Sequence, residues 1–200
     1  MDTPADRRRV AFAVLVAALG YFVDIYDLVL FSILRVPSLR GIGVGEADLT
    51  STGGFLLNVQ LAGMIIGGVV LGVIGDRRGR LAVVFGSIVL YSLANLANAF
   101  VHSVPEYAVA RAVAGFGLAG ELGAGITLVG ELLPTRLRGV GTTIVAAVGL
   151  TGALAAGALA EWLLRRYGAD GWRAAYGVGG AMGLVLLALR VGVLESGLFK

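Results

Sequence analysis

Long apolar runs alternate with short charged or glycine-rich breaks along the chain. A helix needs about 20 mostly apolar residues to cross a bilayer, and the chain offers several runs of that length. They predict six membrane-spanning helices, over 10–34, 51–75, 81–101, 106–133, 140–164 and 174–194. Since no long polar stretch is left over, the pattern predicts an all-α membrane protein with a single six-helix transmembrane domain over 1–200.

The first apolar run has two interpretations. Three arginines, Arg7 to Arg9, precede VAFAVLVAALG, an arrangement that resembles the basic and apolar regions of a secretory signal. The apolar character resumes after Asp27 as LVLFSIL, and no convincing cleavage site interrupts the run. We therefore expect a retained first helix.

Composition supports the membrane class and excludes others. The chain is 58% hydrophobic and 14% charged, with a mean hydropathy of +0.89, outside the range of soluble domains. Its 16 basic residues are scattered in small groups, so nucleic acid is not an expected partner. The chain has no cysteine, and it shows no catalytic set, metal cluster or phosphate-binding loop. Neither enzymatic activity nor a cofactor or metal is expected.

The arginines predict an orientation. If both termini are cytoplasmic, the inner side carries the larger basic group, which comprises Arg7, Arg8, Arg9, Arg77, Arg78, Arg80, Arg136, Arg138, Arg190 and Lys200. The outer side carries Arg35, Arg40, Arg165, Arg166 and Arg173. This asymmetry favours both termini inside, in the cytoplasmic membrane of a prokaryote.

The break at residues 71–84, LGVIGDRRGRLAVV, has a specific spacing. It reads Gly72-x-x-x-Asp76-Arg77-x-Gly79-Arg80 and resembles the loop signature of the major facilitator superfamily. A final basic residue usually follows in that family, whereas this chain has Leu81. Helix 4 carries Arg111-x-x-x-Gly115-x-Gly117 and continues as GELGAGITLVGELLPTRLRG, and ESGLF follows helix 6. These segments are similar to metabolite/proton and sialate or lactate/proton symporters of the family.

The resemblance implies an N-terminal half standing alone, because a complete carrier of this family has twelve helices in two six-helix halves. Each half contains a 3+3 inverted repeat, and substrate binds between the halves. We expect a parallel two-fold homodimer, with a separately encoded second half as the alternative partner and a truncated chain as a third possibility. Lipid, a small-molecule substrate and protons are the other expected partners.

Small residues suggest where two copies would meet. The family pairs helix 2 of one half with helix 5 of the other, and small side chains allow helices to approach closely. The interface candidates are Gly63, Gly67, Gly68, Thr142, Ala146, Gly149 and Ala153. Packing within one chain is the competing interpretation. In the dimer, Asp76 would face the amino end of the partner's helix 5, around 139–141, where a carboxylate is favoured.

Four ionisable residues fall inside the predicted spans, where a charge is costly and commonly functional. They are Asp24, Asp27, Arg111 and Glu121. Asp24 and Asp27 share a helix face, and Asp27 and Arg111 lie at similar depth, roughly 10 Å and 8 Å from the outer ends of their helices. We expect Asp27 to accept a proton, Arg111 to pair with it or hold an anionic substrate, and Asp24 to titrate or bind substrate. Glu121 is expected to bind substrate or to pair with an inner arginine. A static ion pair is the alternative.

A second group of charges lies at the inner ends. We expect a cytoplasmic gate formed by Gly72, Asp76, Arg77, Gly79, Arg80, Glu131, Arg136 and Arg138. Asn58, Gln60, Asn95 and Asn98 are candidates for substrate binding or for hydrogen bonds between helices. The resulting hypothesis is a secondary transporter of small organic solutes, working by alternating access as a proton-coupled symporter of an organic acid or similar metabolite. A non-transporting membrane subunit and a drug/proton antiporter are the alternatives.

Overall fold

The computed structural model describes residues 4–132 and 138–195, with side chains for 14–120 and 138–191 except those of 16, 80, 81 and 190. The described chain is all helical. Its α-helices are α1 (Pro4–Gly41), α2 (Leu49–Arg78), α3 (Arg80–Asn98), α4 (Val104–Leu132), α5 (Arg138–Tyr167) and α6 (Gly171–Glu195). Single 3-10 turns at Glu46–Asp48 and Gly168–Asp170 precede α2 and α6.

The helices are longer than the predicted apolar runs, most clearly at the end of α1. The predicted run ends at residue 34, before Arg35 and Pro37, whereas α1 continues to Gly41 with Pro37 inside it. Proline removes one helical hydrogen bond. Packing offsets this loss, because Leu34, Ser38 and Leu39 are fully buried and Ser38 Oγ lies 3.0 Å from the Tyr107 hydroxyl of α4. In the opposite direction, the predicted run 81–101 is too long, since α3 ends at Asn98.

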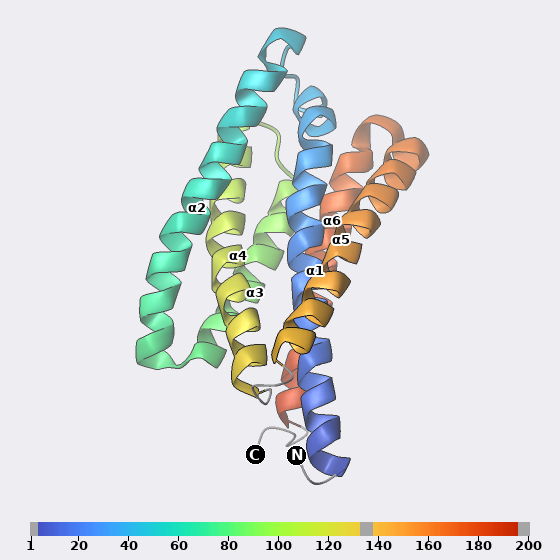
Figure 1. Ribbon diagram of the computed structural model, residues 1–200. Helices are drawn as coiled ribbons and strands as arrows, with labels where there is room; N and C mark the ends of the chain where they lie inside the picture. The colour runs from blue at the N-terminus through green and yellow to red at the C-terminus, as the bar shows by residue number, and fades with distance from the viewer. Residues whose placement is uncertain (1–3, 133–137, 196–200) are drawn as a thin grey trace.

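The bundle is built on two closely packed helix pairs, α1 with α5 and α2 with α4, while α3 packs on both α4 and α6. Figure 1 shows α2 along one edge of the molecule and α5 beside α1 toward the other edge. The helices alternate in direction, so the start of α1 and the end of α6 lie at the same end of the bundle (Figure 1).

Glycines allow the two helices within each pair to pack closely. A Cβ on Gly63 or Gly67 of α2 would overlap the carbonyl oxygens of Ala112 and Phe116 of α4. A Cβ on Gly149 of α5 would overlap the Tyr21 ring of α1. These three interface candidates are therefore occupied by their own chain, which corrects their assignment to a dimer contact.

The remaining interface candidates are more exposed than these three glycines. A Cβ on Gly68 meets no atom within 4 Å, Ala146 is exposed, and Thr142 and Ala153 are half-buried. The surface around them is apolar. Large exposed side chains on these two helices include Ile65, Ile66 and Val69 of α2 and Ile144, Leu150 and Leu154 of α5.

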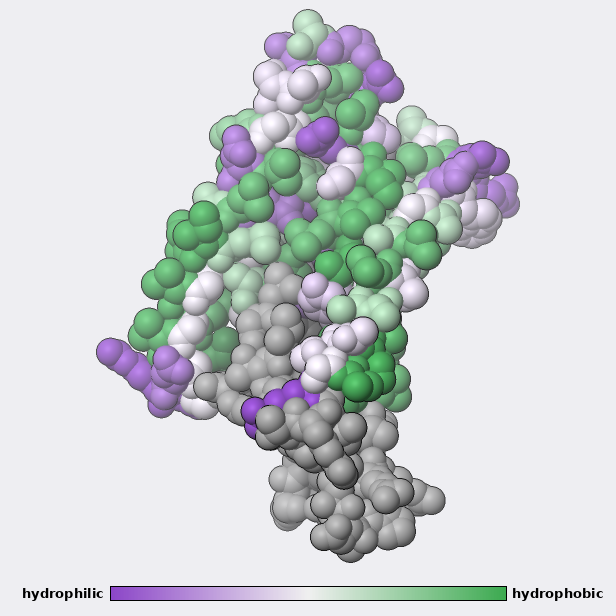
Figure 2. Space-filling view, in the orientation of Figure 1, coloured by the Kyte–Doolittle hydropathy of each residue, from purple (hydrophilic) through white to green (hydrophobic). Residues whose placement is uncertain are grey.

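The surface is hydrophobic along the side of the bundle and hydrophilic at the connections between helices. In Figure 2 the flank of α2 is hydrophobic, whereas hydrophilic residues gather at the α1–α2 connection, the α5–α6 connection and the α2–α3 turn. By length and composition, the described residues hold three candidate membrane spans, Ala17–Gly41, Glu46–Arg78 and Arg138–Leu189, and a shorter apolar helix, Ala82–Asn98. This arrangement is typical of a protein embedded in a bilayer.

The turn between α2 and α3 is shorter than the sequence suggested. Asp76, Arg77 and Arg78 belong to the last turn of α2, and Gly79 alone separates the two helices. Gly79 adopts φ 94° and ψ 138°, a conformation that only glycine adopts without strain. The motif is therefore a charged helix end followed by a one-residue bend, and its Asp76 and Arg77 side chains are exposed.

Candidate functional site

Polar side chains gather in the interior, where α1, α2, α3 and α4 meet. Asp27 of α1 is 6% exposed, Arg111 of α4 is 1% exposed, and Gln60 of α2 and Asn95 of α3 are buried beside them. Burying charge is costly unless each charged group finds a partner of opposite charge or several hydrogen bonds. The structure brings Asp27 and Arg111 together at the same small cavity.

Asn95 connects the two charged residues. Its Nδ2 donates to Asp27 Oδ2 at 2.7 Å, and its Oδ1 accepts from Arg111 Nη2 at 2.7 Å. Both distances are short for an N–H···O bond, as expected where one partner is ionised. A neutral amide therefore links a carboxylate on α1 to a guanidinium on α4 through a side chain of α3.

Arg111 is fixed in position by aromatic rings as well. Its guanidinium carbon lies 4.7 Å from the centroid of the Phe31 ring and 5.4 Å from that of Tyr176, within the range of cation–π attraction. A longer contact of 3.5 Å runs from Nη1 to Oε1 of Gln60. The guanidinium is thus held by α1, α2, α3 and α6 together.

The glycines of the helix 4 motif create room for these contacts. A Cβ on Gly115 would overlap the carbonyl oxygen of Gln60 on α2. A Cβ on Gly117 would stand 2.8 Å from the backbone nitrogen of Tyr91 on α3. Because Gly115 and Gly117 carry no side chain, α2 and α3 approach α4 closely enough for Gln60 and Asn95 to reach Arg111. The spacing Arg111-x-x-x-Gly115-x-Gly117 therefore builds the site.

Three hydroxyl groups, on α1, α4 and α6, are joined by hydrogen bonds near Arg111. The hydroxyls of Tyr107 and Tyr176 share a short hydrogen bond, and the Tyr107 hydroxyl lies 3.0 Å from Ser38 Oγ. The rings of Phe31, Tyr107 and Tyr176 meet edge to face with centroids 6.1 Å apart. These groups satisfy one another inside an apolar core.

A small cavity adjoins the connected side chains. Asp27, Gln60, Tyr91, Asn95 and Arg111 line it together with Ala114 and Leu118, and about 10 Å³ is open to the centre of a water-sized sphere. That is about the space one water molecule needs. Asp24 is 1% exposed and lies nearly one turn before Asp27 on α1, so the predicted pair of carboxylates is buried on one helix.

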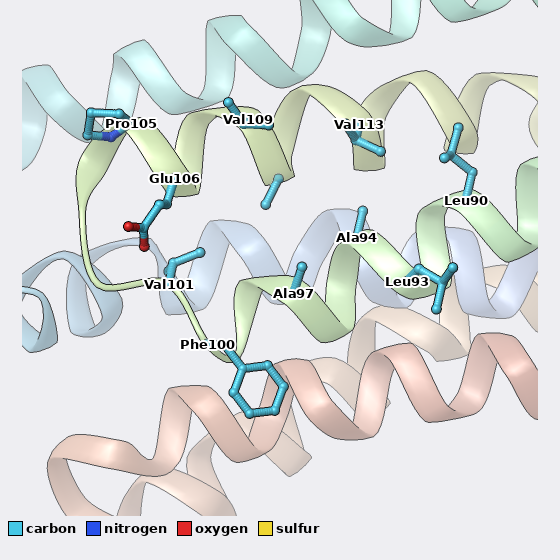
Figure 3. A pocket seen from close by; sticks show the side chains of 11 residues that line it. Leu90, Leu93, Ala94, Ala97, Phe100, Val101, Pro105, Glu106, Val109 and Val113 are labelled. Atoms are coloured by element: carbon cyan, nitrogen blue, oxygen red, sulfur yellow. The ribbon is translucent and has the colours of Figure 1, made fainter.

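A separate groove between α3 and α4 is apolar, with a volume of about 700 Å³. Figure 3 shows Leu90, Leu93, Val109 and Val113 along it and Glu106 near one end. Its lining offers few polar partners, so the polar cluster around Arg111 is the better candidate for a site that handles charge.

The other predicted residues divide into two groups. The side chains of Glu121, Arg80 and Glu131, and the whole of Arg136, lie outside the described residues. Arg138 begins α5, and its side chain is exposed. A Cβ on Gly72 would meet no atom within 4 Å in the described part of the chain. The gate therefore stays a prediction.

Sequence reasoning missed part of the site. Tyr107 lies four residues before Arg111 on one helix face, a spacing that signals proximity, but no such spacing points to Tyr176 on α6. For Asn95, the sequence did not decide between substrate binding and a hydrogen bond between helices. The structure gives it two charged partners, whereas Asn98 donates to the backbone oxygen of Ala94 on its own helix.

Comparisons with known proteins agree on one family. A model described as Major Facilitator Superfamily matches residues 10–196. The gallate transporter of Pseudomonas putida is 28% identical over 199 residues, covering 94% of this chain and 43% of the relative. The 4-hydroxybenzoate transporter of Acinetobacter baylyi is also 28% identical and covers 94% and 39%. A structure of the proton:xylose symporter XylE superposes with a TM-score of 0.81 at 23% identity, covering 92% of this chain and 44% of that one. The chain spans less than half the length of these relatives.

Proposed function

Because the chain belongs to the major facilitator superfamily, we propose that it carries small organic acids across the membrane, with aromatic carboxylates as the substrate class. The named relatives are transport proteins, and this membership confirms the prediction that the chain is not an enzyme. The superposition on XylE supports the fold alone. Relatives that carry gallate and 4-hydroxybenzoate support the choice of probe molecules.

The observation that carries the proposal is the buried connection from Asp27 through Asn95 to Arg111. Well-packed apolar side chains would stabilise the interior at least as well as this buried charged cluster does. The presence of the cluster therefore favours a function. A permanent cation at this depth attracts a substrate carboxylate. When the neighbouring carboxylate of Asp27 takes up a proton, the site loses one negative charge. This loss offsets the negative charge that the substrate brings in during transport.

The proposal includes proton coupling. In the proposed cycle, Asp27 takes up a proton from the outer side when substrate enters and releases it to the inner side after the protein changes conformation. Arg111 holds the substrate carboxylate, and Asp24 serves as a second titrating or substrate-binding group. Glu121 keeps its proposed role as a further binding residue on α4. The cycle is symport, because proton and substrate move in the same direction.

A second six-helix unit completes the proposed carrier. The chain spans 43% of the gallate transporter, and the binding site of this fold lies between two halves. We propose two copies in a parallel two-fold arrangement, with α2 of one copy against α5 of the other. Asp76 then faces the amino end of the partner's α5, and the inner arginines close the cytoplasmic side. A different second half is the alternative partner.

Uptake into liposomes tests the proposal. The purified chain is reconstituted, and labelled 4-hydroxybenzoate, gallate and niacin are added with and without an inward proton gradient. We expect saturable uptake of at least one probe, increased by the gradient. Asp27→Asn loses the increase while it retains exchange of substrate, and Asp48→Asn, an exposed position in the 3-10 turn, leaves both unchanged.

Two outcomes contradict parts of the proposal. Full gradient-driven uptake by Asp27→Asn with an unchanged pH profile removes Asp27 from the coupling step. No uptake of any probe by the wild-type chain alone favours the non-transporting subunit, and gradient-driven export of a cationic dye favours the drug/proton antiporter.

A further inference from the structure

We propose that Asn95 is a positioning residue that senses the charge of Asp27 and transmits it to Arg111. The inference rests on the proposed function, because it assigns the path by which proton uptake on α1 changes the surroundings of the guanidinium on α4. The established resemblance to the family identifies the helix 4 motif but gives Asn95 no role. The geometry that points to it is the pair of 2.7 Å bonds on opposite ends of one amide.

The orientation of the Asn95 amide is dictated by chemistry. A guanidinium has only hydrogen-bond donors, so the amide oxygen of Asn95 is the end that accepts from Arg111. The amide nitrogen must then face Asp27, where it donates to Oδ2. Turning the amide over would place an NH₂ group against the guanidinium. Asn95 therefore presents Asp27 with a donor in every state in which it stays bound to Arg111.

A fixed donor distinguishes the two charge states of Asp27. The structure has the Asn95 N–H donating to Asp27 Oδ2, and an ionised carboxylate is the strongest acceptor for this bond. When a proton binds Oδ2, this oxygen becomes an uncharged hydroxyl, which is a weaker acceptor for the Asn95 N–H than an ionised carboxylate. When the proton binds Oδ1, Oδ2 stays available but is a weaker, uncharged acceptor. In both cases uptake of one proton loosens the tie between α1 and α3.

Arg111 cannot follow Asp27 directly. Its guanidinium is held between the Phe31 and Tyr176 rings, so the freed partner is Asn95 and not the arginine. Once the hydrogen bond from Asn95 Nδ2 to Asp27 is lost, only the bond to Arg111 holds the amide. The Asn95 side chain can then turn its carbonyl oxygen away from Arg111. The guanidinium then has Nη2 available for another oxygen, and a substrate carboxylate supplies one. Proton binding at α1 thereby prepares anion binding at α4.

Several other groups influence the proton on Asp27. On its own helix these are Asp24, nearly one turn away, and the neighbouring Tyr26. Tyr91 of α3 and Arg111 of α4 line the same small cavity, and the Tyr176 hydroxyl approaches from α6. A variant at position 95 leaves all five in place, so its effect on titration isolates the amide.

The protonation state of Asp27 is measured without transport, by infrared spectroscopy of the full chain in lipid discs. The carboxyl band that is missing in Asp27→Asn is followed while the pH is lowered. In Asn95→Leu we expect half of this band to be present at a pH about one unit higher than in the wild type, because the carboxylate has lost one N–H donor. Asn98→Leu, one turn further along α3 and equally buried, is the matched control and leaves the midpoint unchanged.

A charge-swapped variant covers the case in which Asn95→Leu does not fold. The double substitution Asp27→Asn with Asn95→Asp keeps the same groups but places the carboxylate directly against Arg111. We expect its carboxyl band to appear at a lower pH than in the wild type, since the ion pair is now direct. A midpoint equal to that of the wild type in both variants overturns the proposal, because an amide that only packs between helices would not move it.

Transport gives a second readout that separates this inference from the proposed function. In liposomes with an inward proton gradient, Asn95→Leu is expected to retain exchange of 4-hydroxybenzoate. Its gradient-driven accumulation of this probe is expected to fall at least tenfold below that of the wild type. A shifted infrared midpoint in a chain that transports nothing contradicts the proposed carrier but supports the role of Asn95. Normal accumulation by Asn95→Leu with an unshifted midpoint overturns the role of Asn95 and leaves the carrier intact.

Discussion

Arg111 shows at the residue scale why a buried cation in this chain has to be an arginine. A planar guanidinium can stack on two rings while its edge donates to two acceptors, and Arg111 does both, through Phe31 and Tyr176 on its faces and Asn95 and Gln60 at its edge. A lysine ammonium is compact and strongly hydrated, and it lacks the flat faces.

The substitution Arg111→Lys is therefore expected to be severe despite its retained charge. Loss of one charge-assisted hydrogen bond costs about 1.5–3 kcal/mol, which predicts a fall of roughly 10- to 100-fold in the affinity for 4-hydroxybenzoate. Binding is measured with the purified chain in lipid discs. Arg173→Lys is the control, since Arg173 stacks on Trp172 at 4.3 Å and donates to the Ala99 oxygen away from the site. Equal losses in both variants would argue against a special role for Arg111.

The site was partly predictable from the sequence. Asp27 and Arg111 stood out because charges inside apolar runs are rare, and counting residues from the helix ends gave their similar depth. The link between them was not predictable, because the rotation of α3 about its axis decides whether Asn95 or Asn98 faces the pair. Both amides occupy α3, and that rotation is fixed by packing on α4 and α6, where Gly117 lies against Tyr91 and Gly180 against Ser92.

At the scale of elements, α2 presents two adjacent glycines to different surroundings. Gly67 is buried, and its missing side chain is replaced by the backbone of α4 at Phe116. Gly68, the next residue, has no atom within 4 Å of a Cβ position. The contact between α2 and α4 thus involves Gly63 and Gly67, while no described atom of the chain lies against Gly68 on the neighbouring face of α2.

This difference predicts opposite effects for identical substitutions. Gly67→Ala forces α2 away from α4 and is expected to destabilise the protein by about 1–3 kcal/mol, the usual cost of overpacking. Gly68→Ala is expected to be neutral or stabilising by up to about 1 kcal/mol, because alanine favours a helix. Thermal unfolding of the two variants in the same detergent measures the difference. A stable Gly67→Ala variant would mean that α2 can shift on α4 at little cost.

Helix existence and order were predictable, because each predicted apolar run coincides with one helix over most of its length. Helix ends were less so, since Pro37 reads as a stop signal while its neighbours Ser38 and Leu39 are buried by tertiary packing. The partners of the small residues were not predictable either. A stripe of glycines predicts close approach but does not name the neighbour, and Gly63, Gly67 and Gly149 pack inside their own chain.

For the whole molecule, the arrangement leaves two helices with large apolar faces. Ile65 of α2 is 71% exposed and Leu150 of α5 is 64% exposed, on the two helices that pack chiefly against a single neighbour. In the proposed dimer these faces meet across a two-fold axis, so that each copy contributes both contacts.

Cysteine cross-linking tests that contact directly, because the chain has no cysteine of its own. The variant Ile65→Cys with Leu150→Cys is expected to form a disulfide-linked dimer on mild oxidation in lipid discs, as α2 and α5 of two copies lie antiparallel. Leu93→Cys with Val185→Cys, exposed positions on α3 and α6, should remain monomeric. Cross-linking of the control pair alone would place the dimer contact on the opposite side of the bundle.

The start of α1 and the end of α6 lie at one end of the bundle (Figure 1), and this makes the unit suitable for concatenation. Two copies joined head to tail need a linker only on one side of the membrane, and the second copy keeps the orientation of the first. A tandem chain with Asp27 intact in one copy and replaced in the other would then have a fixed ratio of one altered site to one normal site. Comparing it with the doubly altered tandem counts how many proton-binding residues a single transport cycle requires.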